Sequence, residues 1–330
     1  MSVLVTGAAG FIGSHTVDRL LAAGERVIAL DNFNDYYSPA RKRANLASAL
    51  ADPRCTLAEV DVRDADGLET VFEATKREPI TRIIHLAAMA NPRNSVKQPE
   101  LYIDVNEKGS LNILQAAERH EVEVVVLASS SSVYGRDAEV PFRETARTDH
   151  PASPYAFTKK AVETMAYTFH NLYGLNINVL RFFTVYGERG RPDMAVYLFT
   201  DAIANGRPLT LFGDGSEGRD YTYIEDNVSG VTAAAYRPLG YRIINLGNSH
   251  PETNLHLIEV IENTLGRKAE IIHEAPPASE PRLTFSDVTL ARQLLDYNPH
   301  TRLEEGVPRF IAWYEHEAFG RRTITSKSQP

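Results

Sequence analysis

Tyr155 and Lys159 are two residues whose side chains could do chemistry together, because they lie four positions apart in a stretch predicted to be helical. This spacing places the phenol and the ammonium one turn apart on the same helix face. A free tyrosine titrates near ~10, and a neighbouring cation favours the phenolate and lowers that pKa. Because such pairs are more often surface features, a catalytic role requires a cofactor, a partner hydroxyl and a substrate pocket elsewhere in the chain.

A run of four serines at positions 129–132 supplies candidate hydroxyl groups about twenty-five residues before Tyr155. A serine run alone is usually a flexible loop. This one follows a predicted apolar strand at residues 122–128, and ligands of open α/β sheets bind at the C-terminal ends of their strands. The run lacks the Gly-x-Ser-x-Gly pattern of a hydrolase nucleophile. We therefore expect these serines to contact a ligand.

A glycine-rich turn, Gly7-Ala8-Ala9-Gly10-Phe11-Ile12-Gly13, lies between a predicted strand at residues 3–6 and a helix from about Phe11 to Ala23. Such a turn lets the backbone approach a pyrophosphate, and the helix N-terminus offers free N–H groups to it. The next strand, residues 26–30, ends at Asp31. A carboxylate there can accept both ribose hydroxyls and repels a 2′-phosphate, which favours NAD over NADP.

Strands and helices alternate through the first 182 residues. Further strands are predicted at 57–60, 82–86 and 176–182, and helices at 64–76, 99–119 and from about Tyr155 to Tyr173; His85 lies within a core strand, which favours a structural role. This alternation is typical of an α/β fold with a doubly wound parallel sheet. After residue 182 the pattern loosens, with a short strand at 209–212, a strand returning to the sheet at 242–247 and a helix at 255–265.

Composition excludes several classes of protein. The 330 residues are 43% hydrophobic and 24% charged, with a net charge of −8, so a general binder of nucleic acid or anionic membranes is not expected. The single Cys55 excludes an intrachain disulfide and a cysteine-based zinc site, and we predict no metal. No apolar stretch reaches the ~18 residues of a membrane span, and the N-terminus enters a strand directly. A cytoplasmic enzyme is expected.

Four motifs resemble the extended short-chain dehydrogenase/reductase enzymes of nucleotide sugars. They are TGAAGFIGS at 6–14, the serine run before Val133-Tyr134-Gly135, Tyr155-x-x-x-Lys159, and Arg219-Asp220-Tyr221. The resemblance covers the chain to about residue 318. Two further stretches, DNFNDYY at 31–37 and RFFTVYG at 181–187 with RPDMA at 191–195, resemble UDP-glucuronate 4-epimerases in particular.

The resemblance implies a retained NAD⁺ that accepts a hydride from C4 of the sugar and returns it to the opposite face, after the 4-keto intermediate has turned. It implies Tyr155 as the base on the C4 hydroxyl, Lys159 as its partner and a ribose ligand, and Ser130 as the hydroxyl that orients the tyrosine. The implied cofactor contacts, with the glycine turn, are Gly7, Gly10, Phe11, Ile12, Gly13, Asp31, Asn32, Asp61, Val62, Leu86, Ala87, Ala88, Asn106, Tyr155 and Lys159.

The resemblance also implies substrate contacts, and the chain order with no clear linker predicts an interleaved domain division. Phe212 falls where an aromatic lies against uracil, and Arg219 where the diphosphate is held. We expect a Rossmann domain at 1–183 with about 222–250, and a smaller interleaved C-terminal substrate-binding domain at about 184–221 with 251–320; residues 321–330 form a polar tail. Relatives commonly dimerise through the helices near 99–119 and 153–173, so a homodimer is implied.

Positions 131 and 132 distinguish related enzymes that act on the same 4-keto intermediate. Sugar-nucleotide 4,6-dehydratases resemble this chain but carry an Asp-Glu pair there, and UDP-glucuronate decarboxylases place a glutamate at 132. Two serines supply neither the acid nor the base for water elimination. Our hypothesis is that Ser131, Ser132 and Thr184 hydrogen-bond the sugar carboxylate, with Arg191 nearby, in an orientation that resists decarboxylation.

We therefore expect conversion of UDP-glucuronate to UDP-galacturonate. The alternatives are a 4-epimerase of a neutral UDP-sugar (UDP-glucose or UDP-N-acetylglucosamine), a UDP-glucuronate decarboxylase, and a non-catalytic NAD-binding protein. One stretch departs from the relatives, which have an arginine ahead of a Gly-Asp in the last third; residues 276–282 read PPASEPR instead. Arg282 is a candidate substitute for that arginine, and Arg93 is a further candidate substrate contact.

Overall fold

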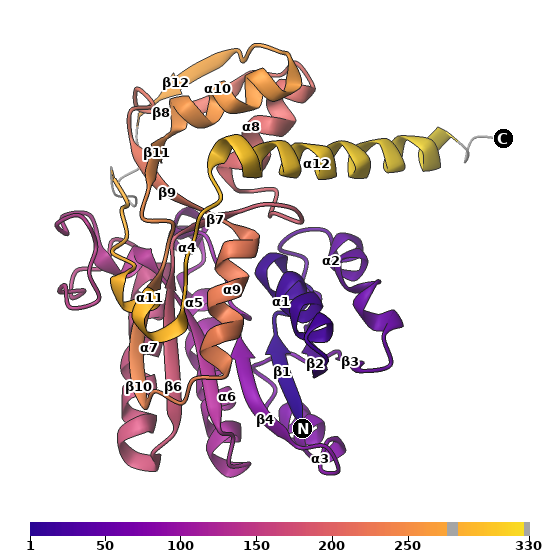
Figure 1. Cartoon of the computed structure of the whole chain (residues 1–330), viewed down its shortest axis with the longest axis vertical. Helices are drawn as coiled ribbons and strands as arrows, with labels where there is room; N and C mark the ends of the chain where they lie inside the picture. The colour runs from indigo at the N-terminus through magenta and orange to yellow at the C-terminus, as the bar shows by residue number, and fades with distance from the viewer. Residues whose placement is uncertain (276–282, 327–330) are drawn as a thin grey trace.

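Seven parallel strands form the central sheet of this computed structural model, which describes residues 1–275 and 283–326. The strand order is β10-β6-β5-β4-β1-β2-β3, with every neighbouring pair parallel (Figure 1). The strands are β1 Ser2–Thr6, β2 Arg26–Leu30, β3 Cys55–Ala58, β4 Ile80–His85, β5 Val124–Ser130, β6 Asn176–Phe182 and β10 Tyr241–Leu246. The predicted doubly wound α/β fold is confirmed.

Helices cover both faces of this sheet, which explains why its strands are nearly continuous apolar runs. All five residues of β1 are buried. One face carries α1 (Phe11–Ala22) packed on α9 (Ile224–Ala235), with α2 (Pro39–Leu46) beside α1. The other face carries α3 (Ala65–Ala74), α6 (Gly109–Arg119) and α7 (Pro154–Tyr173), which pack in that order.

A smaller lobe lies beyond the C-terminal ends of the parallel strands (Figure 1). It holds a three-stranded sheet in the order β11-β9-β7 and a pair formed by β12 and β8. Its strands are β7 Thr184–Tyr186, β8 Leu209–Phe212, β9 Gly218–Tyr223, β11 Pro251–Thr253 and β12 Ile271–Glu274. The chain after β7 also forms, besides α9, the helices α8 Ala195–Ala204, α10 Asn254–Leu265, α11 Thr289–Leu295 and α12 Leu303–Ser326.

Three predicted elements differ from the structure. The helix expected at 99–119 is divided into α5 (Pro99–Tyr102), a π-helical segment η2 (Ile103–Lys108) and α6. The strand expected at 57–60 lies two residues earlier, as β3. The strand expected to end at residue 128 continues as β5 to Ser130, so that two of the four serines belong to the sheet and Ser131–Tyr134 form a 3-10 turn, η3.

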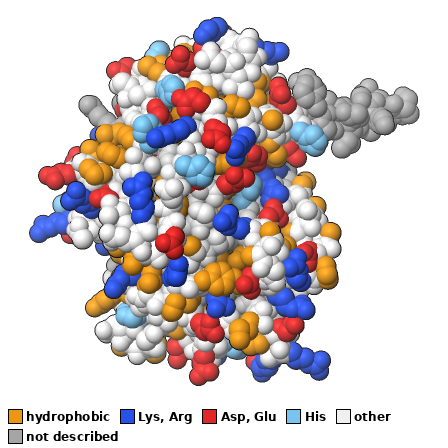
Figure 2. Space-filling view, in the orientation of Figure 1, with side chains coloured by type: hydrophobic (Ala, Val, Ile, Leu, Met, Phe, Trp, Pro, Cys, Tyr) orange, Lys and Arg blue, Asp and Glu red, His pale blue; other side chains and the backbone are white. Residues whose placement is uncertain are grey.

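The visible surface carries acidic and basic side chains intermixed (Figure 2). Among its described side chains this face presents no extended basic patch of the kind that binds nucleic acid. In residues 1–275 and 283–326, no helix combines the length and apolar character that a membrane crossing needs.

Candidate active site

One cavity of about 490 Å³ lies between the strand ends of the large sheet and the smaller lobe. It gathers residues that are far apart in the sequence and that the sequence predicted as site residues. These are Gly7, Gly10, Phe11, Ile12, Gly13, Asp31, Asn32, Asp61, Val62, Leu86, Ala87, Ala88, Arg93, Ser130, Ser131, Ser132, Tyr155, Lys159, Thr184, Arg191, Phe212 and Arg219.

The glycine turn between β1 and α1 leaves room for a phosphate group. A Cβ on Gly13 would lie 2.0 Å from the carbonyl oxygen of Gly7, and Gly7 itself has a φ of +66°, so the turn can close only with glycine at these positions. Helix α1 begins with Gly10 as its N-cap and has no side-chain cap. Its first N–H groups therefore remain for a ligand, which fits the pyrophosphate of a dinucleotide.

Asp31 at the end of β2 is held in one orientation by backbone donors. Its Oδ2 accepts from the Ala9 N–H at 3.0 Å and its Oδ1 from the Phe33 N–H at 2.8 Å. Each carboxylate oxygen keeps a second acceptor position. The buried carboxylate at this strand end therefore fits the ribose hydroxyls of a dinucleotide.

Asp61 lies at the same end of the cavity and is fixed by two neighbours. Arg63 donates to both of its carboxylate oxygens, at 3.0 and 2.9 Å, and Asn32 Nδ2 donates at 2.7 Å. The hydrogen bonds from Arg63 are the main reason that the pKa of Asp61 falls to about 2. This carboxylate is therefore a permanently ionised acceptor beside the cavity.

Tyr155 and Lys159 are positioned by the start of α7. Ser153 caps the helix by accepting from the Ala156 N–H at 3.2 Å, and Pro154 occupies the first helical position. The Lys159 ammonium reaches back to the large sheet and donates to the carbonyl of Ala128 in β5 at 2.7 Å. The helix cap thus places the phenol against the strand that carries the serines.

Burial decides the protonation of Tyr155 in the protein alone. Burial raises the pKa of the phenol, and a hydrogen bond with Ser130 and the charge of Arg191 oppose that rise only in part. Burial also lowers the pKa of Lys159 to about 8, against the opposing charge of Glu163. In the protein without its cofactor, desolvation of the phenol outweighs nearby positive charge, so a neighbouring cation does not by itself bring the pKa of Tyr155 below its ordinary value.

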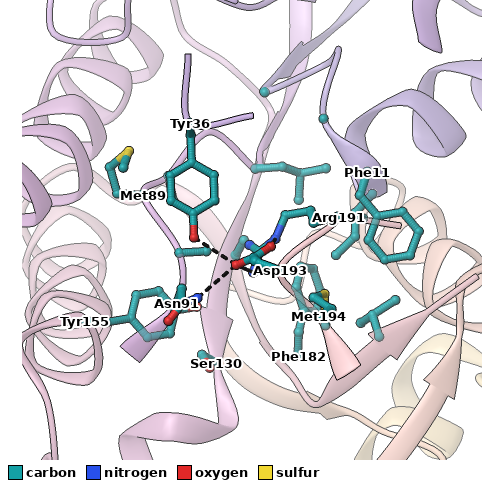
Figure 3. A pocket seen from close by; sticks show the side chains of 18 of the residues that line it. Phe11, Tyr36, Met89, Asn91, Ser130, Tyr155, Phe182, Arg191, Asp193 and Met194 are labelled. Carbon is teal, nitrogen blue, oxygen red and sulfur yellow. Dashed lines mark hydrogen bonds and ion pairs between the residues drawn. The ribbon is translucent and has the colours of Figure 1, made fainter. Parts of the chain in front are cut away.

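The serine run and Arg191 lie at the end of the cavity that contains Tyr155. Ser130 Oγ donates to Ser132 Oγ at 3.1 Å and accepts from the Ser132 N–H at 3.2 Å, which fixes the 3-10 turn. Arg191 forms an ion pair with Asp193 at 3.1 Å. Ser130 and Arg191 therefore line the same cavity as the phenol of Tyr155 (Figure 3).

At the other side of the cavity, Arg93 and Phe212 meet across the two lobes. The Arg93 guanidinium on α4 (Pro92–Lys97) lies 4.3 Å from the centre of the Phe212 ring at the end of β8. Arg219 on β9 also lines the cavity and lies 3.7 Å from Glu217. This side offers an aromatic face and two cations, which suit a nucleobase and a diphosphate.

Asn106 is a predicted cofactor contact that does not line the cavity. Asn106 in the π-helical segment is buried, accepts from the Met89 N–H at 2.8 Å, and donates to the Met89 carbonyl at 3.0 Å and to Thr158 Oγ1 at 2.9 Å. It connects the loop after β4 to α7, so its side chain positions the cavity wall. Arg282 lies outside the described residues.

His85 has the structural role that its place in a core strand predicted. Its ring nitrogens bond the hydroxyls of Thr6 and Ser110, at 2.7 and 3.1 Å. Complete burial is the main reason that the pKa of His85 falls to about 3, so the ring is neutral. Within the part of the chain that the structure describes, no group of three or more His, Cys, Asp or Glu side chains could hold a metal ion.

Several residues of the cavity were missed by the sequence analysis. Tyr36, Asn91 and Asp193 form one hydrogen-bonded group beside Arg191 (Figure 3). Two of them lie in stretches that resemble UDP-glucuronate 4-epimerases, Tyr36 within DNFNDYY and Asp193 within RPDMA, so a signal existed for both. No motif marked Asn91, or the cavity-lining Met89.

Comparison with known proteins agrees with this geometry. The chain is 40% identical to the UDP-glucuronate 4-epimerase of Thermodesulfobacterium geofontis over 94% of this chain and 95% of that protein. It is similar to the crystal structure of Bacillus cereus UDP-glucuronic acid 4-epimerase in complex with UDP-glucuronic acid and NAD, with a TM-score of 0.90, 31% identity, and coverage of 96% of this chain and 100% of that one.

A neutral-sugar enzyme is nearly as similar in structure. The UDP-glucose 4-epimerase of Thermotoga maritima, solved with UDP-glucose, gives a TM-score of 0.88 at 30% identity, over 96% of this chain and 100% of that one. The model of the NAD dependent epimerase/dehydratase family matches residues 3–247. The chain therefore belongs to this family of enzymes, whose cofactor is NAD.

Proposed function

We propose that this protein converts UDP-glucuronate to UDP-galacturonate by inverting C4 of the sugar. The observation that carries the proposal is the grouping of Ser131, Ser132, Thr184 and Arg191 in the same cavity as Tyr155. Hydroxyls and a guanidinium are suitable donors for a carboxylate. Relatives with this activity at 40% identity and nearly full coverage support the same assignment.

The residues of this chain have separate tasks in the proposed reaction. NAD⁺, when bound, supplies a hydride acceptor that gives the hydride back to the same carbon, and a positive charge near the phenol. Tyr155 takes the proton of the C4 hydroxyl and later returns one, since its phenol lines the cavity beside Ser130 and Lys159. Ser130 lies beside the phenol in the cavity and is assigned to orient it, and Lys159 reaches both the cofactor space and β5.

Retention of the carboxylate is assigned to the serines. A 4-ketoglucuronate is a β-keto acid and is prone to lose CO₂, whereas hydrogen bonds to its carboxylate oppose that loss. Ser131 and Ser132 lie on a turn fixed by Ser130, and neither is an acid or base suited to water elimination. The proposed product therefore keeps all six carbons.

Kinetics with two substrates test the proposal. Purified protein is incubated separately with UDP-glucuronate and UDP-glucose, without added NAD⁺, and products are followed by NMR. We expect UDP-galacturonate from the first and a kcat/KM for the second at least tenfold lower (about 1.4 kcal/mol). Formation of UDP-galactose alone would instead identify a neutral-sugar 4-epimerase.

We also propose that the protein is a homodimer formed through α7 and residues 99–119, which form α5, η2 and α6. Ile103 on η2 and Phe157 on α7 are 43% and 46% exposed, on segments that pack side by side. Large exposed apolar residues on adjacent helices favour a protein interface. Light scattering of a Phe157→Asp variant should show a monomer, with Ile272→Asp, at a similarly exposed apolar residue on β12, as the control. The division into two interleaved domains and the cytoplasmic location stay predictions.

A further inference from the structure

Asp193 lies inside the cavity at the point where three separate segments meet (Figure 3). Its Oδ1 accepts from Arg191 Nε at 3.1 Å. Its Oδ2 accepts from Arg191 Nη2 at 3.3 Å, from the Tyr36 hydroxyl at 2.8 Å and from Asn91 Nδ2 at 2.9 Å. This carboxylate is therefore surrounded by donors from the loop after β2, the turn after β4 and its own loop.

The donors around Asp193 are themselves held in place. Asn94 Nδ2 donates to the Tyr36 hydroxyl at 3.1 Å. The Asn91 side-chain oxygen accepts from two backbone N–H groups at the start of α4, at 3.0 and 3.2 Å, and Tyr102 donates to the Asn91 carbonyl at 3.0 Å. The arrangement is therefore preorganised without a ligand.

Asp193 is ionised in this arrangement. Its burial opposes ionisation, but the charge of Arg191 and the hydrogen bonds from Asn91 and Tyr36 outweigh burial and hold its pKa below the usual range. The Arg191 charge also reaches Tyr155, whose pKa it lowers. A charged pair with no net charge therefore stands beside the catalytic phenol.

The pairing limits what Arg191 can offer to a substrate. Asp193 takes the Nε and Nη2 edge of the guanidinium, so that a substrate carboxylate can approach the remaining edge, formed by Nη1 and the second N–H of Nη2. The Arg191 side chain is 22% exposed, and its charge without Asp193 would attract any anion in the cavity. Such attraction would act on both epimers and tighten ground-state binding without raising kcat.

We propose that Asp193 sets the preference of the site between acidic and neutral sugars, because its carboxylate neutralises the charge of Arg191 within the cavity. The carboxylate of an acidic sugar is then held through hydroxyl groups and one end of the guanidinium. Asp193 is in this account a specificity-determining residue that acts through Arg191. The inference rests on the proposed function for its acidic substrate, but its test measures binding and does not need turnover.

The test uses four proteins that differ in the net charge of the pair. In a Tyr155→Phe background, which prevents turnover, the Kd values of UDP-glucuronate and UDP-glucose are measured by calorimetry on the NAD-loaded protein. The background protein and the Asp193→Asn/Arg191→Gln double variant have a neutral pair, Asp193→Asn is positive and Arg191→Gln is negative. The preference for UDP-glucuronate should rise about tenfold in Asp193→Asn, fall in Arg191→Gln, and return near the background value in the double variant.

Each outcome decides the inference. If Asp193 only supports the fold, Asp193→Asn weakens both ligands equally and the preference stays unchanged, which overturns the inference. If Asp193→Asn does not fold, the test compares the double variant with Arg191→Gln. The double variant should prefer UDP-glucuronate over UDP-glucose more strongly, and equal preferences in the two proteins would contradict the inference. If the wild-type protein epimerises only UDP-glucose, the proposed function is wrong. The binding preferences of the four proteins would still test the role of Asp193.

Discussion

Arg181 and Glu163 form a bidentate ion pair, at 2.8 Å for both contacts, in which each side chain is only 1% exposed. Arg181 lies on β6 and Glu163 on α7, one turn after Lys159. Ser129 at the end of β5 donates to Glu163 at 2.7 Å, and the Arg181 guanidinium lies 4.7 Å from the centre of the Tyr134 ring. The pair therefore holds the helix that carries Tyr155 and Lys159 against the strand end that carries Ser130.

Glu163→Gln should destabilise the protein strongly. Removing one member of a buried ion pair leaves the other charge unpaired, at a cost of about 3–5 kcal/mol. Urea unfolding measures this cost. Glu59→Gln is the matched control, because Glu59 pairs with Arg43 in an exposed ion pair whose loss costs about 0–1 kcal/mol. The Glu163→Gln/Arg181→Met double variant should lose less than the two single variants combined, and additive losses would count against coupling.

His85 should make the protein less stable as the pH falls below the pKa that this histidine has in the unfolded chain. The folded pKa is about 3 and the unfolded value is about 6.5. Above pH 6.5 the ring is neutral in both states; below it, only the unfolded state takes up a proton, so stability is lost as pH falls towards the folded pKa, by about 1.4 kcal/mol per unit.

The His85→Gln variant isolates this contribution. Wild type should lose about 2 kcal/mol more than the variant between pH 6.5 and pH 5 in denaturant unfolding. Carboxylates titrate in the same range in both proteins, and their effect cancels in the difference. Parallel pH profiles for the two proteins would mean that His85 becomes protonated in the folded state.

Tyr155→Phe should remove turnover and leave binding intact. A positioned acid–base group contributes about 10²–10⁴-fold to rate, so kcat should fall by at least that much. The ring still fills its place, and the Kd of UDP-glucuronate should change less than threefold (about 0.65 kcal/mol). Tyr173→Phe, at an exposed tyrosine near the end of the same helix, is the control. Wild-type kcat in Tyr155→Phe would exclude the phenol as the base.

Phe212→Leu should weaken the binding of UDP and of UDP-glucuronate to a similar extent. Stacking of a base on an aromatic ring contributes about 1–3 kcal/mol, so both Kd values should rise roughly fivefold or more, while kcat of bound substrate stays close to wild type. Phe212→Tyr keeps the ring and should bind normally. An unchanged Kd for UDP in Phe212→Leu would show that the uracil lies elsewhere.

Local patterns predicted many elements of the large sheet. Both β2 and β6 have the predicted bounds, since each is an apolar run that starts shortly after a helix-ending glycine, Gly24 or Gly174. β5 lies two residues later than the predicted strand at 122–128, because its end depends on a neighbour. Ser129 and Ser130 pair with Arg181 and Phe182 of β6, and this pairing extends the strand into residues that have low strand propensity.

The motifs of the candidate site could be predicted from the sequence, but the pKa values and charge contacts of its residues could not. Burial raises the pKa of Tyr155, and burial is a property of the assembled fold. Asp193 bonds Tyr36 and Asn91, which precede it by 157 and 102 positions. No local spacing can predict such contacts, although the stretch that contains Asp193 was marked by its resemblance.

The central claim, transient oxidation at C4 with the carboxylate retained, is tested most directly by an isotope measurement. UDP-glucuronate with deuterium at C4 is incubated with the purified protein in ordinary water, and the product is analysed by NMR. The account predicts UDP-galacturonate that keeps both its carboxylate and its C4 deuterium, because the same hydride leaves and returns. A product with hydrogen at C4, or a UDP-pentose formed by loss of CO₂, would contradict it.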